Sequence, residues 1–178
     1  EALTEAGEER IIRKAGDLIN DEKAAAVIEH ITYHVLDDCY ATDVFTAAQM
    51  KAQLGVNAME VQKGVYDHVV YDSTNERHFA EALEAHKEVA VYVKLPDGFY
   101  ISTPVGHYNP DWAIAFREGE VKHIYFVAET KGSMRSMELR GIEKSKIACA
   151  RKHFAAISSN HVVYDVVNSY DELLKKVM

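Results

Sequence analysis

Residues 110–116, PDWAIAF, and residues 121–131, VKHIYFVAETK, decide the fold of this chain. Two apolar runs separated by a turn around Gly119 are typical of a β-hairpin. In an antiparallel pair, opposed residue numbers have a constant sum, and a turn of two to four residues here gives sums of about 237 to 239. Asp111 is therefore expected to face a residue within 126–128, one to three positions from Glu129, and a bulge would shift this by about one residue.

Three charged side chains are expected to meet at one end of this hairpin. Glu129 and Lys131 are two residues apart, so strand alternation places them on the same face. Neighbouring strands lie about 4.8 Å apart, which lets the carboxylates of Asp111 and Glu129 approach one point. Two carboxylates with water suit Mg²⁺ or Mn²⁺, and a lysine would stabilise developing phosphate charge or orient the attacking water. This composition favours hydrolysis of a phosphodiester.

The same residues also fit a structural Asp–Glu–Lys salt-bridge cluster at the rim of a sheet. Glu76 allows two interpretations as well. The sequence Ser73-Thr74-Asn75-Glu76 is typical of a capping box, which explains Glu76 as a helix-capping acid. Its place on the first turn of a helix also lets it supply a third carboxylate to a metal.

The order of the other expected elements points to an α/β fold, with a mixed central β-sheet flanked by helices. Residues 1–64 show helical spacing at 11–19, 26–36 and 43–54 and no catalytic pattern, so we expect a helical N-terminal segment. Residues 65–178 are expected to form the second domain. Its predicted strands are 65–71, 89–94, 99–103, 112–116, 121–128 and 161–167, and its predicted helices follow Ser73, run over 138–156, and follow Ser169.

The charge of the chain is unevenly distributed. The net charge is −8, but residues 1–90 hold 18 acids and 8 bases, whereas residues 91–178 hold 10 acids and 12 bases. DNA contacts depend on the local field rather than on the total charge. Four bases on the predicted helix 138–156 can track a DNA backbone or form a solubilising face, namely Lys144, Lys146, Arg151 and Lys152.

The cysteines and the hydropathy of the sequence indicate in which compartment the protein is expected. Cys39 and Cys149 each lie in a helical pattern without metal-ligand spacing, so both are expected to be reduced core thiols of a cytoplasmic protein. The sequence contains no stretch typical of a membrane span or of a secretion signal. The chain starts with Glu1 rather than methionine, which favours a processed product or an excised domain.

Asp111 with Glu129-Thr130-Lys131 resembles the signature of PD-(D/E)XK nucleases. More narrowly, the segments YNPDW (108–112), ETKG (129–132) and KIACARKHF (146–154) together resemble the C-terminal nuclease domain of the restriction (Res) subunit of type III restriction enzymes. The likeness covers about residues 72–164. It implies that Asp111 and Glu129 are metal ligands, that Lys131 is the catalytic lysine, and that Glu76 is a helix-borne acid near the metal.

The resemblance also implies partners and a cofactor. The family's full subunit carries an ATP-driven helicase motor upstream of the nuclease and pairs with a methyltransferase (Mod) subunit. This sequence has no GxxxxGK[ST] segment, so ATP is not expected to bind this chain. We therefore expect an excised Mg²⁺-dependent nuclease domain that acts on double-stranded DNA. The alternatives are a freestanding repair nuclease or junction resolvase, and a catalytically silent module that docks onto partner subunits.

Overall fold

A computed structural model describes residues 5–33, 56–117, 119, 125–130, 141–157 and 162–178. Its centre is a four-stranded sheet in the order β3-β6-β7-β8, formed by β3 (Val89–Lys94), β6 (Trp112–Phe116), β7 (Tyr125–Thr130) and β8 (Val162–Val167). β3, β6 and β7 are antiparallel, whereas β7 and β8 run parallel. The expected mixed sheet in an α/β fold is therefore confirmed.

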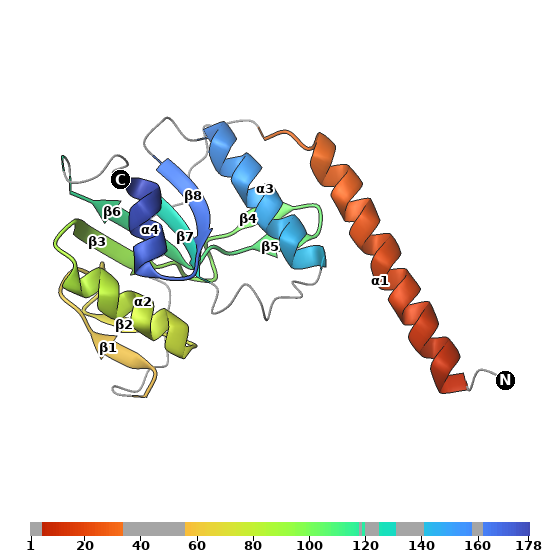
Figure 1. The fold of residues 1–178 in the computed structure, drawn as a ribbon, viewed down its shortest axis with the longest axis horizontal. Helices are drawn as coiled ribbons and strands as arrows, with labels where there is room; N and C mark the ends of the chain where they lie inside the picture. Colours follow the sequence, from red (N-terminus) through yellow and green to blue (C-terminus); the bar gives the residue numbers. More distant parts are fainter. Residues whose placement is uncertain (1–4, 34–55, 118, 120–124, 131–140, 158–161) are drawn as a thin grey trace.

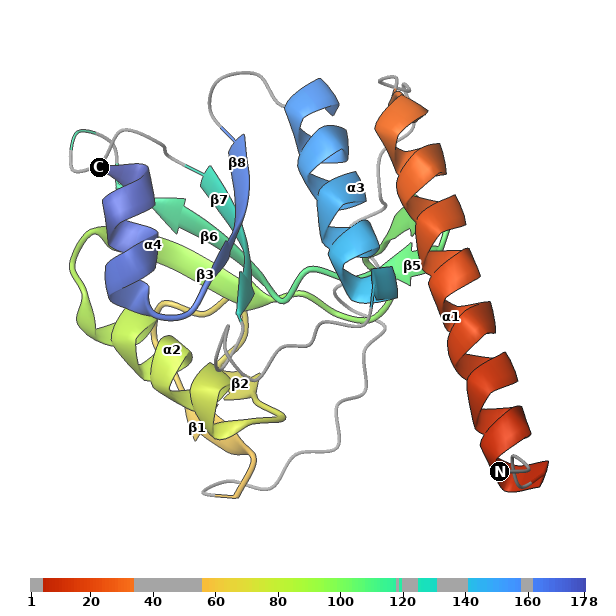
Figure 2. The ribbon, with the colours of Figure 1, turned by 45° about the vertical axis from the view of Figure 1, so that its right-hand side comes forward.

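Helices cover both faces of this sheet (Figures 1 and 2). Alternate residues of β6 separate the two cores. Trp112, Ile114 and Phe116 are buried with α2 (Thr74–Ala85) and α4 (Tyr170–Val177). Ala113 lies on the other face, in a cluster with Ile147 and other residues of α3 (Gly141–Ile157). The period-2 pattern of β6 thus decides which side chains meet which helix.

Two small hairpins accompany the main sheet. β1 (Ala58–Glu60) pairs with β2 (His68–Val70), and β4 (Ile101–Thr103) pairs with β5 (Gly106–Tyr108). The expected helical segment 1–64 therefore contains a strand. Because β1 pairs with β2 across residue 64, residues 58–64 pack with the sheet domain rather than with the N-terminal helix.

The N-terminal helix α1 (Glu5–His30) is one continuous element and not the two helices expected within 11–36. Its C-terminal end packs against α3, and the rest of it extends away from the sheet domain (Figure 1). Lys152 of α3 caps this end, since its Nζ donates to the carbonyl oxygens of Ile28 at 2.6 Å and Glu29 at 2.8 Å. The helix expected over 43–54, together with Cys39, lies outside the described residues.

The register of the β6–β7 pair differs from the sequence-based expectation. Trp112 lies opposite Ala128 and Ala113 opposite Val127, so the opposed numbers sum to 240 rather than to 237–239. The observed register is therefore shifted by one residue from the expected range 126–128, which is the size of shift expected from a bulge. One step outward along the observed register, Asp111 lies opposite Glu129.

Candidate active site

The strands bring polar residues together at one end of the sheet. Lys94, at the end of β3, pairs with Trp112, at the start of β6. Trp112 pairs in turn with Ala128, near the end of β7, and Thr130 lies beside Val167, the last residue of β8. The end of β3, the start of β6 and the ends of β7 and β8 therefore share one edge, and Asp111 lies at this edge.

The carboxylate of Asp111 is held by Thr130. Its Oδ2 accepts hydrogen bonds from the Thr130 backbone amide at 2.7 Å and from the Thr130 hydroxyl at 2.8 Å. The indole Nε1 of Trp112 donates to the same hydroxyl oxygen at 3.3 Å. Trp112 and Thr130 are buried, whereas Asp111 is half-buried, so buried donors fix the orientation of a carboxylate that is still partly exposed.

The other two residues of the expected catalytic set are only partly described. The backbone of Glu129 belongs to β7 and lies beside Val166 of β8. The side chain of Glu129 and the whole of Lys131 lie outside the described residues. The structure thus places Asp111 and the Glu129 backbone at the same sheet end, and the meeting of the three charged groups stays a prediction.

Glu76 lies in a second polar cluster, on the face of the sheet covered by α2. The Nζ of Lys94 donates to Oδ2 of Asp72 and to Oε2 of Glu76, each at 2.6 Å. The Lys94 and Glu76 side chains are only 17% and 15% exposed. Burial alone would lower the pKa of Lys94, but the hydrogen bonds to Asp72 and Glu76 outweigh it, so the pKa is raised. Lys94 therefore stays charged and ties α2 to β3.

The helix cap next to this cluster is the one the sequence predicts. The Ser73 hydroxyl accepts from the Glu76 amide at 3.2 Å, and the Glu76 carboxylate reaches back to the Asp72 amide at 3.0 Å. Sequence reasoning missed Lys94 and Thr130. A signal for Lys94 was present, because a lysine ends an otherwise apolar strand while Asp72 and Glu76 offer two acids one helical turn apart.

Residues able to hold a metal are present but not gathered in the described part of the chain, where no group of three His, Cys, Asp or Glu side chains is placed for one ion. Asp111 fits a hard cation nevertheless, because metal-binding carboxylates are commonly oriented by hydrogen bonds like those from Thr130. Mg²⁺ is commonly bound by only one or two protein carboxylates together with water and phosphate oxygens. The donor chemistry at this edge therefore suits Mg²⁺ or Mn²⁺.

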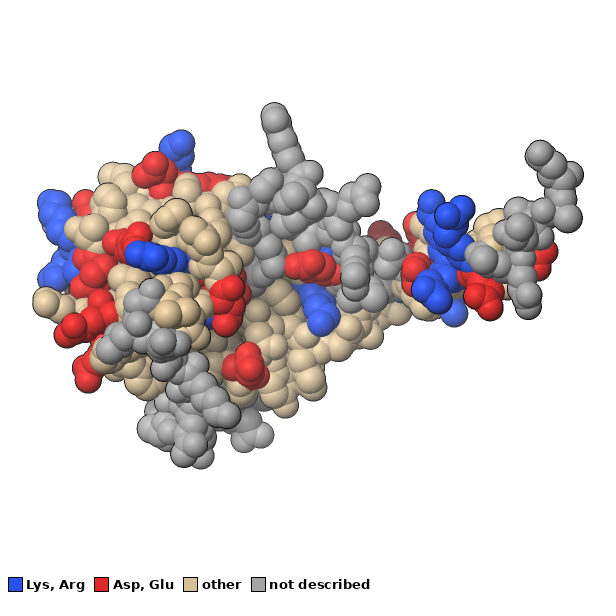
Figure 3. Space-filling view, turned by 90° about the horizontal axis from the view of Figure 1, so that it is seen from below, with Lys and Arg blue, Asp and Glu red and all other residues tan. Residues whose placement is uncertain are grey.

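The four basic residues expected on α3, which could contact DNA or form a solubilising face, differ in exposure and in their partners. Arg151 forms a salt bridge with Asp165 of β8 at 2.8 Å, and Lys152 caps α1. Lys144 is exposed, whereas Lys146 is half-buried and reaches toward the turn of the β4–β5 hairpin. On the face seen in Figure 3, Lys and Arg lie among Asp and Glu and form no continuous basic surface in the part that is coloured.

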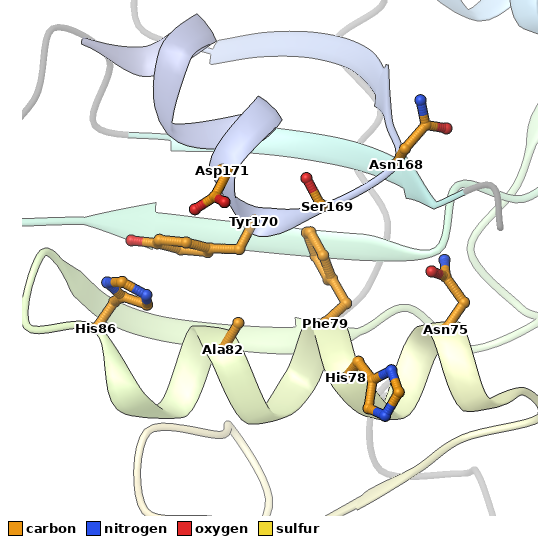
Figure 4. Close-up of a pocket in the computed structure, with 9 residues that line it drawn as sticks. All are labelled: Asn75, His78, Phe79, Ala82, His86, Asn168, Ser169, Tyr170 and Asp171. Carbon is orange, nitrogen blue, oxygen red and sulfur yellow. The ribbon is translucent and has the colours of Figure 1, made fainter. Parts of the chain in front are cut away.

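A pocket of about 320 Å³ opens between α2 and the connection from β8 to α4 (Figure 4). His86 stacks on Tyr170 with ring centroids 4.0 Å apart, and Phe79 forms part of the floor. Burial raises the pKa of Tyr170 to about 12, with help from Glu88 and Asp171. The pocket lies on the α2 face, where its lining mixes imidazole, amide and carboxylate groups from Asn75, His78, His86, Asn168 and Asp171.

Comparisons with known proteins add one match. A family model described as an endonuclease domain matches residues 62–170, more than half of the chain. The matched range includes Glu76, Asp111, Glu129 and Lys131. No curated protein and no solved structure matches the chain. Among the described residues, no helix is both long and apolar enough to pass through a membrane.

Proposed function

The chain belongs to the endonuclease domain family and is a nuclease domain, and from this premise we propose that it hydrolyses phosphodiester bonds of double-stranded DNA with Mg²⁺, or Mn²⁺ as a substitute. The observation that carries the proposal is the carboxylate of Asp111, which Thr130 orients at the sheet edge, one residue beyond the pair of Trp112 with Ala128.

Each residue has a separate role in the proposed reaction. Asp111 and Glu129 hold the divalent cation, which when bound supplies positive charge to the scissile phosphate and activates water. Lys131 orients the attacking water or holds the developing negative charge. The water oxygen forms a bond to phosphorus, an ester P–O bond breaks, and the departing oxygen takes up a proton.

Glu76 takes a supporting place in this proposal. Its Oε2 already accepts hydrogen bonds from Lys94 and from the Asp72 amide. It can contribute to the metal only through Oε1 unless the Lys94 pair breaks. Glu76 would therefore be a distant third acid, and Asp111 and Glu129 would dominate the affinity for the ion.

The finer identity we propose is the nuclease domain of a type III restriction enzyme Res subunit, acting in the cytoplasm. The support is the joint presence of the YNPDW, ETKG and KIACARKHF segments. In this proposal the helicase motor region of the same parent polypeptide binds ATP, and the Mod methyltransferase subunit is the partner. Arg151 and Lys152 then have structural roles, because each already has a partner within the domain.

Mn²⁺ titration of the isolated chain by calorimetry or electron paramagnetic resonance tests the proposed metal site. We expect Asp111→Asn to weaken Mn²⁺ binding at least about tenfold, since it removes one of very few protein ligands. Asp67→Asn, at an exposed acid in the loop before β2, is the matched control and should bind as the parent does. Equal Mn²⁺ binding by the Asp111→Asn variant and the parent chain would exclude the site.

A plasmid-cleavage assay tests whether the chain cuts DNA as part of the proposed restriction assembly or as a freestanding nuclease. The parent assembly carrying Asp111→Asn should lose DNA cleavage while keeping ATP hydrolysis by its motor. Robust cutting of plasmid by the isolated chain, without ATP or partner subunits, would instead identify a freestanding nuclease.

A further inference from the structure

The tryptophan next to Asp111 is held in place by the core on the α2 face of the sheet. Trp112 of β6 is fully buried. Its ring centroid lies 5.6 Å from that of Phe79 of α2 and 6.2 Å from that of Tyr92 of β3. Side chains in a close-packed interior keep to low-energy rotamers. The position of the indole N–H is therefore set by the core and not by the candidate site.

The indole N–H determines the direction of a hydrogen bond at the site. Nε1 of Trp112 can only donate, so the hydroxyl oxygen of Thr130, 3.3 Å away, is the acceptor. The same hydroxyl oxygen lies 2.8 Å from Oδ2 of Asp111, and an ionised carboxylate can only accept. With the indole N–H on one side of the hydroxyl oxygen, the single hydroxyl hydrogen is left for Asp111.

Backbone amides from the two neighbouring strands also hold Asp111. The amide of Leu95, which directly follows β3, donates to the carbonyl oxygen of Asp111 at 2.8 Å. The amide of Thr130 in β7 donates to Oδ2 of Asp111 at 2.7 Å. The direction of these amides follows from the sheet, whereas a hydroxyl can rotate. The hydroxyl of Thr130 is therefore the contact whose direction depends on Trp112.

We propose that Trp112 is a positioning residue of the metal site, whose indole N–H keeps the Thr130 hydroxyl turned toward Asp111. The carboxylate is then preorganised for a divalent cation by a chain of contacts that begins in the core under α2. Groups that hydrogen-bond to a metal ligand orient it and raise the affinity for the metal. The proposal rests on the proposed nuclease function, in which Asp111 is a metal ligand, and adds a residue that acts without touching the metal.

Calorimetric titration with Mn²⁺ tests this role. Trp112→Phe removes the indole N–H and keeps an aromatic ring, and we expect it to bind Mn²⁺ about threefold to tenfold more weakly than the parent chain, because one hydrogen bond that orients the site is lost. Tyr92→Phe is the matched control. It also removes a hydrogen bond from a buried aromatic residue of the same face, but the acceptor is Oε2 of Glu84 in α2, at 3.1 Å. The control should bind Mn²⁺ as the parent does.

A double-mutant cycle separates positioning from packing. Because Trp112 acts through the hydroxyl of Thr130, Trp112→Phe should change Mn²⁺ affinity by less than about twofold in a Thr130→Val background. A packing effect would instead weaken binding by the same factor in both backgrounds. Circular dichroism would verify that each variant is folded. The same loss in both backgrounds, or parental Mn²⁺ affinity in folded Trp112→Phe, would overturn the positioning role.

A spectroscopic measurement on the unaltered chain does not depend on how the variants fold. Trp112 is the only tryptophan in the sequence, so its indole N–H gives a single signal in an NMR spectrum. During a titration with Mg²⁺ this signal should move with the same Kd that calorimetry gives for Mg²⁺. A signal that stays in place while Mg²⁺ binds would refute the link from Trp112 to the metal. Failure of the metal site itself is seen separately, as equal Mn²⁺ binding by Asp111→Asn and the parent chain.

Discussion

Replacing Thr130 with valine removes one hydroxyl from the centre of the candidate site and keeps the shape of the side chain. That hydroxyl donates to Asp111 at 2.8 Å and accepts from Trp112 at 3.3 Å. The backbone amide of residue 130, which donates to Asp111 at 2.7 Å, is kept in the variant, so the carboxylate loses one of the two hydrogen bonds that residue 130 gives it.

The expected loss of stability follows from these two bonds. A hydrogen bond to a charged group contributes about 1.5–3 kcal/mol, and a buried donor left without a partner costs about 1–3 kcal/mol. The Trp112 bond is long, which favours the lower end of its range, and the added methyl of valine returns roughly 0.8 kcal/mol. We expect the free energy of unfolding to fall by about 2–4 kcal/mol.

Urea unfolding followed by tryptophan fluorescence measures this directly, because Trp112 is the only tryptophan in the sequence. Thr130→Ser is the matched control, since it keeps the hydroxyl and loses only a methyl group, at a cost of about 1 kcal/mol. The valine variant should in addition bind Mn²⁺ about tenfold more weakly than the serine variant. If serine and valine gave the same urea midpoint and the same Mn²⁺ affinity, the hydroxyl would have no part in holding Asp111.

Four further predictions concern the surroundings of the site. Lys94→Met should lower the free energy of unfolding by about 2 kcal/mol in urea titrations, because it leaves two neighbouring carboxylates without their cation. Glu76→Gln should weaken Mn²⁺ binding less than Asp111→Asn does in the same calorimetric titration, since Lys94 already occupies Oε2. Burial lowers the pKa of His153 below its usual 6.5, so the stability it contributes is complete above that pH and is lost as the pH falls toward the folded-state pKa. His153→Phe should therefore flatten the dependence of unfolding free energy on pH between about 7 and 5. Lys152→Met should release the end of α1, seen as faster proteolytic cutting within α1 while the sheet domain stays intact.

The strand and helix pattern around the site could be predicted because it depends on local periodicity. The strand expected over 112–116 is β6, and its alternation of large and small residues separates a face with Trp112, Ile114 and Phe116 from one with Ala113. The serine caps before α2 and α4 were also recognisable, since Ser73 and Ser169 each accept the backbone amide three residues later.

Short strands, the register between strands and the continuity of a long helix could not be predicted in the same way, because local periodicity does not determine them. A strand was expected over 99–103, where β4 lies, but its partner β5 was not, because β5 has only three residues and begins at the positive φ of Gly106. The register of β7 differs by one residue from the expected range, because periodicity alone does not fix the alignment of two paired strands. α1 was expected as two helices, yet polar residues between two apolar stretches do not interrupt a helix that is mostly exposed to solvent.

Thr130 shows why part of the site was hidden in the sequence. It stands between the two charged residues of the expected Glu-x-Lys motif, where any residue is allowed by the motif itself. In the sheet this position lies beside Val167, which belongs to the core under α2 and α4, and the Thr130 side chain is itself buried. A buried hydroxyl needs partners, and Asp111 and Trp112 provide them, but neither contact could be inferred before the register was known.

The acidic cluster around Glu76 already contains a cation, and this weighs against a divalent ion at that position. Lys94 pairs with Trp112 in the sheet and so shares the α2 face, where Glu76 and Asp72 surround it. Two unit charges 4 Å apart interact by about 4 kcal/mol at an effective dielectric constant of 20, and a divalent ion doubles this to about 8 kcal/mol. A metal beside Glu76 would therefore be repelled strongly by Lys94. The two hydrogen bonds from Thr130 to Asp111 come from a hydroxyl and a backbone amide, which orient the carboxylate and add no positive charge of their own. The lysine that stabilises the junction of α2 and β3 thus disfavours a divalent ion beside Glu76.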